Sequence, residues 1–300
     1  MNRYDVFVKI LDTGSFSRAA EELGYTQSAV SQIVKSLEEE FSTTLLVRAR
    51  NGLSLTANGE ELLPYIRAVC GAHRELKEKQ KEMLGLRGGV IRIGTIASVS
   101  CTWLPGLMSG FKEKYPDVQF FLQQQLTYTG ISKLIREGSV DFGFVNTDVA
   151  EGLHSVTLAE DEMMAVLPRG HVLARKKTVP LEQLAGEPFI LMEAGQYNEL
   201  VRYFADHNLK PNIQYRVFDD YTIMAMIEKN MGVGILPKLI LRRRGYDVAV
   251  RPLTPSLFRH IGVAYRDRAL LPLAARYFIE YLVECNEAGF FKARAGAVPK

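Results

Sequence analysis

The sequence predicts a mixed α/β fold in three parts: a helical N-terminal unit that ends in a β-hairpin, one long helix, and a pair of α/β lobes. Apolar residues recur every three or four positions up to about residue 84, which is the spacing of helices. Asn51-Gly52 interrupts this pattern with a hairpin signal, and from Val90 onwards strands alternate with helices. We place the boundaries at residues 1–59, 60–88 and 89–300, with a first lobe at about 90–160 and 267–290 and a second at about 161–266.

The composition argues against several classes of protein. The chain of 300 residues is 47% hydrophobic and 24% charged, as in an ordinary globular protein. No apolar run reaches the roughly 18 residues of a membrane span, and the N-terminus does not resemble a signal peptide, so we expect a cytoplasmic protein with no membrane contact. Cys70, Cys101 and Cys285 form no CxxC pair. We therefore expect no metal, no cofactor and no disulfide framework.

Three short helices are expected before residue 42. The first ends at Gly14 and the second at Gly24, because glycine tolerates the left-handed conformation that closes a helix. Ser17 is the expected N-cap of the second helix and Thr26 that of the third. The apolar positions that these helices should bury are Phe7, Ile10, Leu11, Ala19, Ala20, Leu23, Val30, Ile33, Val34 and Leu37.

The third helix has an unusual polar face, because small uncharged groups stand where a solvated helix usually carries pairs of Glu and Lys. Two helices joined by a tight turn that contains glycine form a helix-turn-helix, whose second helix enters the major groove of DNA. Gln and Ser can hydrogen-bond base edges, and Lys35 can reach a phosphate or a guanine. The face that we expect to contact DNA consists of Thr26, Gln27, Ser28, Ser31, Gln32 and Lys35.

The segment LLVRARNGLSLT, residues 45–56, predicts a hairpin that serves as a wing beside this face. Arg48, Arg50 and Asn51 at its tip are expected to contact phosphates or the minor groove, since no acidic residue occurs between residues 41 and 59. Residues 1–87 contain twelve Lys or Arg and twelve Asp or Glu, so their net charge is zero. The prediction that the hairpin contacts DNA therefore depends on where the cations lie and not on the net charge. The alternative, a structural bundle with a solvated face, does not explain the wing.

The N-terminal region resembles the winged helix-turn-helix of LysR-type transcriptional regulators over about 55 residues in one register. The sequence differs from the residues that are frequent in this family at four positions. Ser28 replaces a frequent Pro, Ser42 a Gly, Leu46 a Phe, and Asn58 a small residue. Ser28 lies on the face expected to contact DNA, so the base preference stays open. The matching residues are Phe7, GSF at 14–16, AA at 19–20, Leu23, TQSAVSQ at 26–32, Ile33, LE at 37–38, Arg48, LT at 55–56 and Gly59.

One long helix is predicted from Thr56 to about Leu84, with Pro64 near its start. Its seam positions alternate spacings of four and three, as in a coiled coil. A seam without a partner inside the chain predicts a second copy, and a two-fold dimer of helix-turn-helix units reads an inverted pair of half-sites. The seam consists of Leu62, Ile66, Val69, His73, Leu76, Gln80 and Met83.

The chain after Val90 predicts two α/β lobes. IRIGTI, VQFFLQQ and DFGFVN have the pattern of parallel strands in one lobe, and PFILM, IQYRVF and GVGILP that of strands in another. HIGVAYR and the helix LPLAARYFIEYLVE should return to the first lobe. This layout is similar to the effector-binding domain of LysR-type regulators, which implies a two-lobed, periplasmic-binding-protein-like architecture with a cleft.

Ligands of open α/β sheets bind at the carboxyl ends of the strands, so the loops there are candidate contacts to an effector. Their hydroxyl and amide groups suit a small polar or carboxylate compound, and Glu193 leaves room for an amine. Cys101 is either a small pocket residue or a thiolate near a helix N-terminus. The expected effector contacts are Ser98, Ser100, Cys101, Thr102, Thr127, Tyr128, Thr129, Asn146, Thr147, Glu193, Gln196 and Tyr197.

These features predict a homodimeric or homotetrameric transcriptional regulator that binds double-stranded DNA at a promoter or operator, responds to a small molecule and works with RNA polymerase. The alternatives are an effector-independent or thiol-responsive regulator, and then a solute-binding protein or an enzyme. The last two would need an export signal or a catalytic constellation, and the sequence has no GxGxxG, P-loop, GxSxG or HExxH motif. We therefore expect no enzymatic activity.

Overall fold

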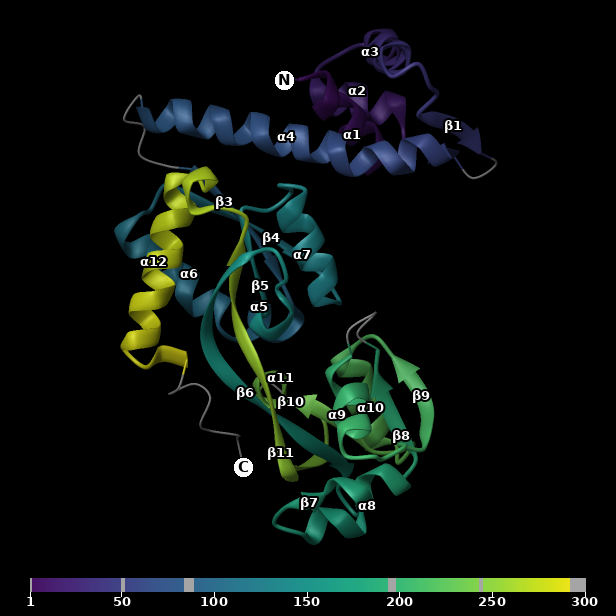
Figure 1. The fold of residues 1–300 in the computed structure, drawn as a ribbon, viewed down its shortest axis with the longest axis vertical. Coiled ribbons are helices and arrows are strands. Elements are labelled where there is room, and N and C mark those ends of the chain that lie inside the picture. Colours follow the sequence, from purple (N-terminus) through teal and green to yellow (C-terminus); the bar gives the residue numbers. More distant parts are fainter. Residues whose placement is uncertain (1, 50–51, 84–88, 194–197, 243–244, 292–300) are drawn as a thin grey trace. The chain divides into compact units, whose positions relative to one another are not determined.

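The computed structural model describes residues 2–49, 52–83, 89–193, 198–242 and 245–291 (Figure 1). The chain divides into two compact units, one of residues 1–86 with 136–139 and the other of residues 87–135 with 140–300. None of the described helices is long and apolar enough to cross a membrane.

Short helices, a hairpin and a long helix make up the N-terminal unit. Gly14 and Gly24 end the first two helices with φ of 64° and 70°, as predicted. The N-cap of the second helix is Ser15 and not the predicted Ser17, because the chain becomes extended directly after Gly14, and the Ser15 hydroxyl accepts from the N–H of Arg18. The elements are α1 (Arg3–Thr13), α2 (Phe16–Leu23), α3 (Gln27–Glu40), β1 (Leu46–Ala49), β2 (Gly52–Leu55) and α4 (Ala57–Met83).

One apolar core holds these elements together. The stripe of α3 faces this core as predicted, since Val30, Val34 and Leu37 are buried. β1 and β2 pair antiparallel from Leu46 opposite Leu55 to Ala49 opposite Gly52, which confirms the hairpin. Its two loop residues, Arg50 and Asn51, lie outside the described residues. The buried core residues are Val6, Phe7, Ile10, Ala19, Ala20, Val30, Val34, Leu37, Leu45, Leu46 and Ile66.

The long helix α4 has apolar side chains of two kinds. Ile66 is 2% exposed and belongs to the core of the N-terminal unit, with Leu62 packed beside it. The start of the predicted seam therefore has partners inside the chain. Tyr65, Val69 and Leu76 are 70%, 44% and 67% exposed and follow one another at four and seven residues. These three, called here the exposed stripe of α4, lie on one side of the helix.

A mixed seven-stranded sheet forms the frame of the C-terminal unit, with strand order β10-β6-β11-β5-β3-β4 and β7 paired to β11. β3 pairs in parallel with β4 and with β5, as the strand–helix alternation predicted, and β8 and β9 form a separate parallel pair. The elements are β3 (Gly89–Thr95), α5 (Ala97–Thr102), α6 (Leu104–Lys114), β4 (Val118–Gln124), α7 (Tyr128–Arg136), β5 (Phe142–Asn146), β6 (His154–Pro168), β7 (Val179–Pro180), α8 (Leu181–Gly186), β8 (Phe189–Met192), α9 (Glu199–Asp206), β9 (Ile213–Val217), α10 (Asp220–Glu228), β10 (Gly234–Pro237), α11 (Lys238–Leu241), β11 (Val248–Tyr265) and α12 (Leu273–Glu287).

Two long antiparallel strands, β6 with 15 residues and β11 with 18, join the two lobes of this unit (Figure 1). One end of β11 pairs with β5 in the first lobe, and β6 pairs with β10 in the second. Each lobe has its own buried core: Trp103, Phe111 and Phe278 lie in the first, and Phe189 and Phe204 in the second. The ends of the parallel strands and the helices that follow them meet between these cores.

Candidate functional site

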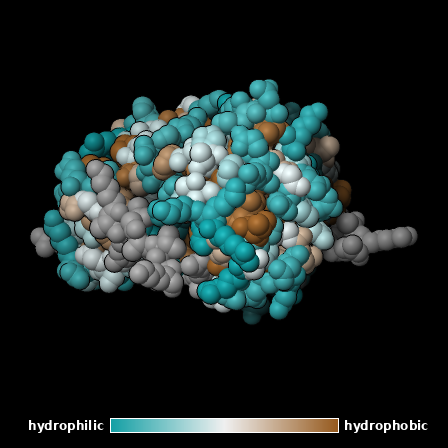
Figure 2. All heavy atoms as spheres, turned by 90° about the horizontal axis from the view of Figure 1, so that it is seen from below, coloured by the Kyte–Doolittle hydropathy of each residue, from teal (hydrophilic) through white to brown (hydrophobic). Residues whose placement is uncertain are grey.

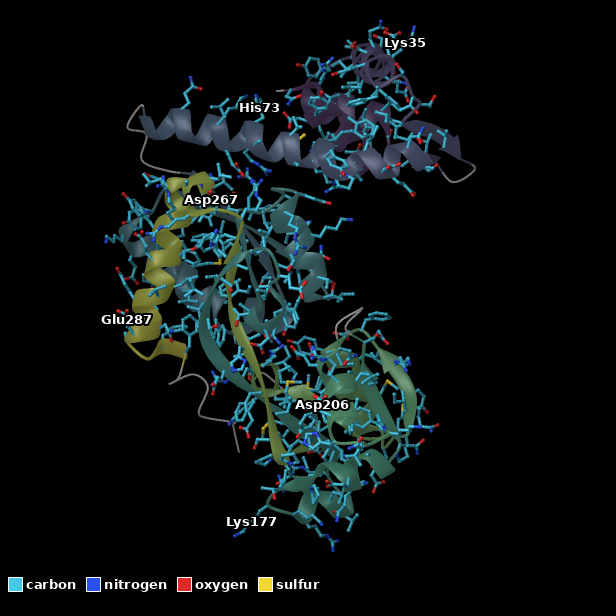
Figure 3. All side chains as sticks on the ribbon, in the orientation of Figure 1. Lys35, His73, Lys177, Asp206, Asp267 and Glu287 are labelled. Carbon is cyan, nitrogen blue, oxygen red and sulfur yellow. The ribbon has the colours of Figure 1, made fainter. Side chains whose placement is uncertain are left out.

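The polar face of α3 is open to solvent along its whole length. Thr26, its N-cap, accepts a hydrogen bond from the N–H of Ala29 at 3.2 Å. Lys35 lies on the outer side of α3, where its ammonium group is 3.7 Å from Glu39 (Figure 3). These polar side chains cover the side of the helix opposite its buried stripe. The exposed residues are Thr26, Gln27, Ser28, Ser31, Gln32 and Lys35.

The acidic end of α3 is held by contacts within the unit. Oε1 of Glu38 accepts hydrogen bonds from the N–H groups of Leu45 and Leu46 at 2.7 and 3.2 Å. Glu40 forms an ion pair with Arg3 at 2.8 Å. The Glu38 carboxylate therefore ties the C-terminal part of α3 to the start of the hairpin.

A groove of about 200 Å³ runs between α3 and the hairpin. Three of the expected DNA contacts, Gln27, Ser31 and Lys35, border this groove, and Val47 and Leu53 border it from the hairpin. Arg48 is a residue of strand β1, directly after Val47. The hairpin thus lies beside the polar face of α3, as the order of the elements predicted.

The C-terminal unit contains a pocket of about 110 Å³ where elements of both lobes meet. One wall comes from the starts of α5 and α7 with the end of β4, and the other from the starts of α9 and α10 with the ends of β8 and β10. The lining residues are Ile96, Ala97, Ser98, Gln124, Gln125, Leu126, Thr127, Tyr128, Met163, Met192, Asn198, Glu199, Leu200, Phe218, Asp219, Asp220, Ile235, Pro237 and Arg259.

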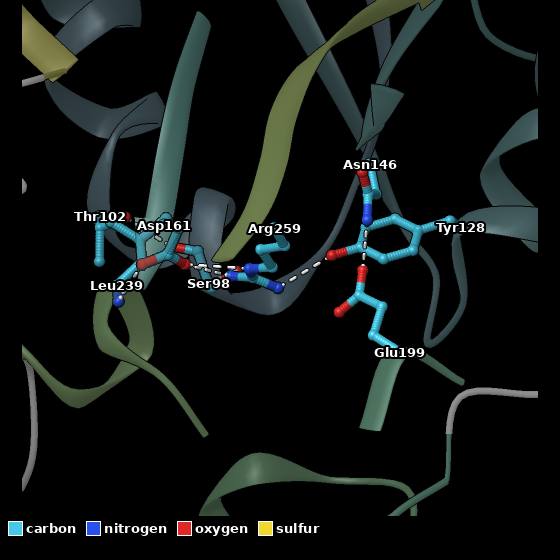
Figure 4. A network of polar contacts seen from close by, with 8 residues as sticks. All are labelled: Ser98, Thr102, Tyr128, Asn146, Asp161, Glu199, Leu239 and Arg259. Carbon is cyan, nitrogen blue, oxygen red and sulfur yellow. Dashed lines mark hydrogen bonds and ion pairs between the residues drawn. The ribbon is translucent and has the colours of Figure 1, made fainter. Parts of the chain in front are cut away.

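A buried arginine lines this pocket and forms the centre of a network of polar contacts (Figure 4). Arg259 on β11 donates from Nε and Nη2 to Oδ2 of Asp161 at 3.0 and 2.7 Å. It also donates to the hydroxyls of Tyr128 and Ser98 at 3.0 and 2.9 Å. The other oxygen of Asp161 accepts from the N–H of Leu239 at 3.0 Å. These contacts join β6, β11, α5, α7 and α11 around one ion pair.

The partners of Arg259 fix the charges in this network. Burial would lower the pKa of Arg259, but Tyr128, Asp161 and Glu199 raise it above its ordinary value, so the guanidinium stays charged. Burial raises the pKa of the Tyr128 hydroxyl above its ordinary value, so Tyr128 stays neutral. The charge of Arg259 is thus matched by the buried carboxylate of Asp161.

Three further carboxyl groups line the pocket. Glu199, the first residue of α9, accepts a hydrogen bond from Nδ2 of Asn146 at 2.5 Å, and burial raises the pKa of Glu199. Asp219 caps α10; burial opposes its ionisation, but hydrogen bonds from Thr222 hold the pKa of Asp219 below its ordinary value. Burial raises the pKa of Asp220 to about 6. Oδ1 of Asp220 is buried and has no hydrogen-bond partner among the described residues.

The structure brings four of the predicted effector contacts to this pocket. Ser98, Thr127 and Tyr128 line it, and Asn146 reaches it through Glu199. Gln196 and Tyr197 lie outside the described residues.

Six other predicted contacts do not line the pocket and have partners elsewhere. The Ser100 hydroxyl lies 3.0 Å from the carbonyl of Ile96 and that of Thr102 2.5 Å from the carbonyl of Ser98. The hydroxyl of Thr129 meets that of Thr127 at 3.1 Å, and that of Thr147 meets Thr157 at 2.9 Å. Tyr221 donates to the Cys101 sulfur at 3.7 Å, and Glu193 pairs with Arg216 at 3.1 Å. For these six residues, contact with an effector stays a prediction.

Sequence reasoning missed the charged part of the pocket. Glu199, Asp219 and Asp220 occupy the first positions of helices, where acidic residues are common for reasons of capping and the helix dipole. Arg259 lies within a strand and had no local signal. An acidic residue at the start of a helix that directly follows a predicted strand could have marked the first three.

Residues 1–60 match the bacterial regulatory helix-turn-helix family of LysR type, and residues 85–286 match the LysR substrate-binding domain. The regulator YvbU of Bacillus subtilis (strain 168), an uncharacterized HTH-type transcriptional regulator, is 31% identical over 284 residues, which cover 93% of this chain and 96% of the relative.

Two solved structures share the fold. Full-length CbnR in complex with its target DNA matches with a TM-score of 0.68 at 19% identity and covers 95% of this chain and 99% of its own. The effector-binding domain of QuiR in complex with shikimate matches with a TM-score of 0.62 at 22% identity and covers 67% of this chain and 98% of its own. Both domains of this chain therefore have the architecture that the sequence predicted, and the chain belongs to the LysR family of bacterial helix-turn-helix transcriptional regulators.

Proposed function

We propose that this regulator reads DNA bases with the polar face of α3, while the hairpin contacts the neighbouring backbone. The observation that carries the proposal is the exposed row of Gln27, Ser31, Gln32 and Lys35 on the second helix of a helix-turn-helix, beside a groove that the hairpin borders. Short amides and hydroxyls read base edges in the major groove, whereas cations position the protein on phosphates. Arg48, Arg50 and Asn51 are the proposed backbone contacts.

The regulator acts as a homodimer, with the exposed stripe of α4 against a second copy. Tyr65, Val69 and Leu76 would leave apolar area in water in a single chain. Helices of two copies that pack along these positions bury that area and place two DNA-binding units about a two-fold axis. A pair of such dimers gives a tetramer.

An effector binds in the pocket that Arg259 and Glu199 line. The pocket suits this role because elements of both lobes form it, so a ligand there contacts both and favours one arrangement of the lobes. A difference in affinity of a few kcal/mol between two arrangements is enough to shift their populations. The solved complex of the QuiR effector-binding domain with shikimate supports a small-molecule ligand for a domain of this fold.

The regulator acts on RNA polymerase, either by direct contact or by changing the course of the promoter DNA. It acts in the cytoplasm, where a bacterial cell keeps its DNA. The relatives that match this chain over nearly its full length are named as regulators. We therefore infer that the pocket serves for binding and not for catalysis.

The substitution Gln32→Ala tests the reading of DNA. The DNA target is first selected from random duplexes with the unchanged protein. Loss of a base contact should weaken binding to the selected DNA by about 1–3 kcal/mol per site and leave binding to random DNA almost unchanged. Fluorescence anisotropy on both DNAs measures this.

The matched control is Gln119→Ala, which removes the same group from an exposed position on β4. It should change neither affinity. Equal losses on selected and random DNA for Gln32→Ala would show that Gln32 does not read bases.

A further inference from the structure

The pocket of the C-terminal unit carries more negative charge than its arginine can balance. Arg259 gives its Nε and Nη2 hydrogen bonds to Asp161, and this pair is buried, with side chains 7% and 6% exposed. Three more carboxyl groups line the same pocket, those of Glu199, Asp219 and Asp220. None of the described lysines and no second described arginine lines it.

The three carboxyl groups differ in how well they are satisfied. Asp219 accepts hydrogen bonds from the hydroxyl and the N–H of Thr222, so its carboxylate is already satisfied as the N-cap of α10. Glu199 accepts one hydrogen bond from the part of the chain that the structure describes, from Asn146. Oδ1 of Asp220 is buried and accepts none from the described residues. A buried carboxylate oxygen without a donor costs free energy, so Oδ1 of Asp220 is an acceptor that a ligand can satisfy.

The rest of the lining suits the body of an organic molecule. Met163, Met192, Leu200 and Ile235 supply apolar surface. Phe218, next to Asp219 in the chain, lines the pocket with 54% of its surface exposed. An aromatic ring beside carboxylates is a favourable environment for an ammonium group, because the ring face attracts cations.

We propose that the effector is a small organic cation, an amine with an apolar body, whose ammonium group binds Asp220 and Glu199. This inference rests on the proposed function of the pocket as the effector site and adds the chemical class of the ligand. An ammonium group supplies three donors to the unsatisfied oxygens and neutralises the excess charge. A carboxylate ligand would add a further negative charge beside Glu199 and Asp220.

Matched sets of probes test this inference with the full chain. Each set has one hydrocarbon body, butyl, cyclohexyl or phenethyl, that carries an ammonium, a hydroxyl or a carboxylate group. Isothermal titration calorimetry at pH 7.5 gives the affinities. In at least one set the ammonium member should bind at least about tenfold more tightly than the other two, as expected for charged hydrogen bonds.

Variants locate the ammonium site. Asp220→Asn and Glu199→Gln keep the shape of each side chain and remove its charge, and each should weaken binding of the ammonium member at least about tenfold. The matched control is Glu182→Gln, which removes an exposed carboxylate of α8 in the same lobe that does not line the pocket; it should leave the affinity unchanged. Circular dichroism of each variant shows that the fold is kept.

Three results would overturn the inference: tighter binding of the carboxylate members, no measurable binding of any ammonium member, or an unchanged affinity in Asp220→Asn. Binding of the same protein to selected DNA without ligand is measured alongside. If the protein binds the carboxylate members and still binds selected DNA, the inference of an amine effector is rejected and the proposed function is retained. If the unchanged chain shows no specific DNA binding, the proposed function itself is rejected.

Discussion

Single side chains decide how the two domains of this regulator contact their ligands. On α3, Gln32 is exposed and uncharged, so the base contact proposed for it would contribute to specificity. In the pocket, Asp220 and Glu199 are carboxyl groups whose ionisation is opposed by burial. Carboxyl groups whose pKa is raised by burial are common at functional sites. The raised pKa values of Asp220 and Glu199 therefore support a binding role for the pocket.

Asp220 makes the stability of the free protein depend on pH. Its pKa in the folded state is about 6, above the ordinary value of 3.8, so the folded state binds more protons than the unfolded state between these values. Stability should therefore fall as the pH rises from about 4 to 6 and then stay level. Asp220→Asn removes this loss and should stabilise the protein at pH 7.5 by on the order of 1–3 kcal/mol, and by less at pH 4.5.

Urea unfolding curves of both proteins at pH 4.5 and 7.5 measure this difference. Glu182→Gln serves again as the control, since that carboxylate is exposed to solvent. If Asp220→Asn lowers stability at pH 7.5, then its surroundings stabilise the Asp220 carboxylate in the free protein, which contradicts the raised pKa of this group.

Contacts between elements hold the DNA-binding unit in shape. Glu38 near the end of α3 accepts hydrogen bonds from two backbone N–H groups, those of Leu45 and Leu46, and thereby fixes the hairpin beside α3. Two buried donors would lose their acceptor without this carboxylate. Within the described ranges, the neighbouring acid Glu39 has only an exposed ion pair with Lys35 at 3.7 Å.

Glu38→Ala should therefore destabilise the N-terminal unit by about 2 kcal/mol, whereas Glu39→Ala should cost less than about 0.5 kcal/mol. Thermal unfolding followed by circular dichroism compares the two, and DNA binding of Glu38→Ala should weaken on all sequences because the hairpin is less well held. Equal effects of the two substitutions would mean that the carboxylate of Glu38 does not fix the hairpin.

The helix ends could be predicted from residues at the ends themselves. Features that depend on contacts between distant segments could not be predicted in this way. Gly14, Gly24 and Thr26 terminate or cap helices through their own backbone and side chains, so their roles could be read from the sequence. The two serines at 15 and 17 are equally good caps, and only the conformation after Gly14 selects the first.

The long strands and the pocket depend on contacts between distant segments. The pairing of β11 with β6 shifts register between Pro252 and Leu257, so no single alternation of apolar residues runs through it. Glu199, Asp220 and Arg259 come from three distant segments and meet only in the folded unit. The fold class was therefore predictable, whereas the charge of the pocket was not.

At the scale of the whole molecule, the proposed regulator consists of two chains. The exposed stripe of α4, with Tyr65, Val69 and Leu76, should lie between them. Charges introduced at Val69 and Leu76 together, as Val69→Glu and Leu76→Glu, would be desolvated in a dimer and should shift the protein to monomers. Sedimentation velocity measures the change. Lys77→Glu changes an exposed residue next to Leu76 and is the control, which should leave the dimer intact. A dimer that persists with Val69→Glu and Leu76→Glu together would show that the interface lies elsewhere.

Selection of DNA from a fully randomised duplex library by the full-length protein tests the central claim most directly. If α3 reads bases and two copies bind together, the enriched duplexes should carry one half-site twice, in inverted orientation, with centres about 10 base pairs or a multiple of this apart. Enrichment of a single unrepeated site, or no enrichment over the starting library, would contradict a two-fold regulator that reads DNA through α3.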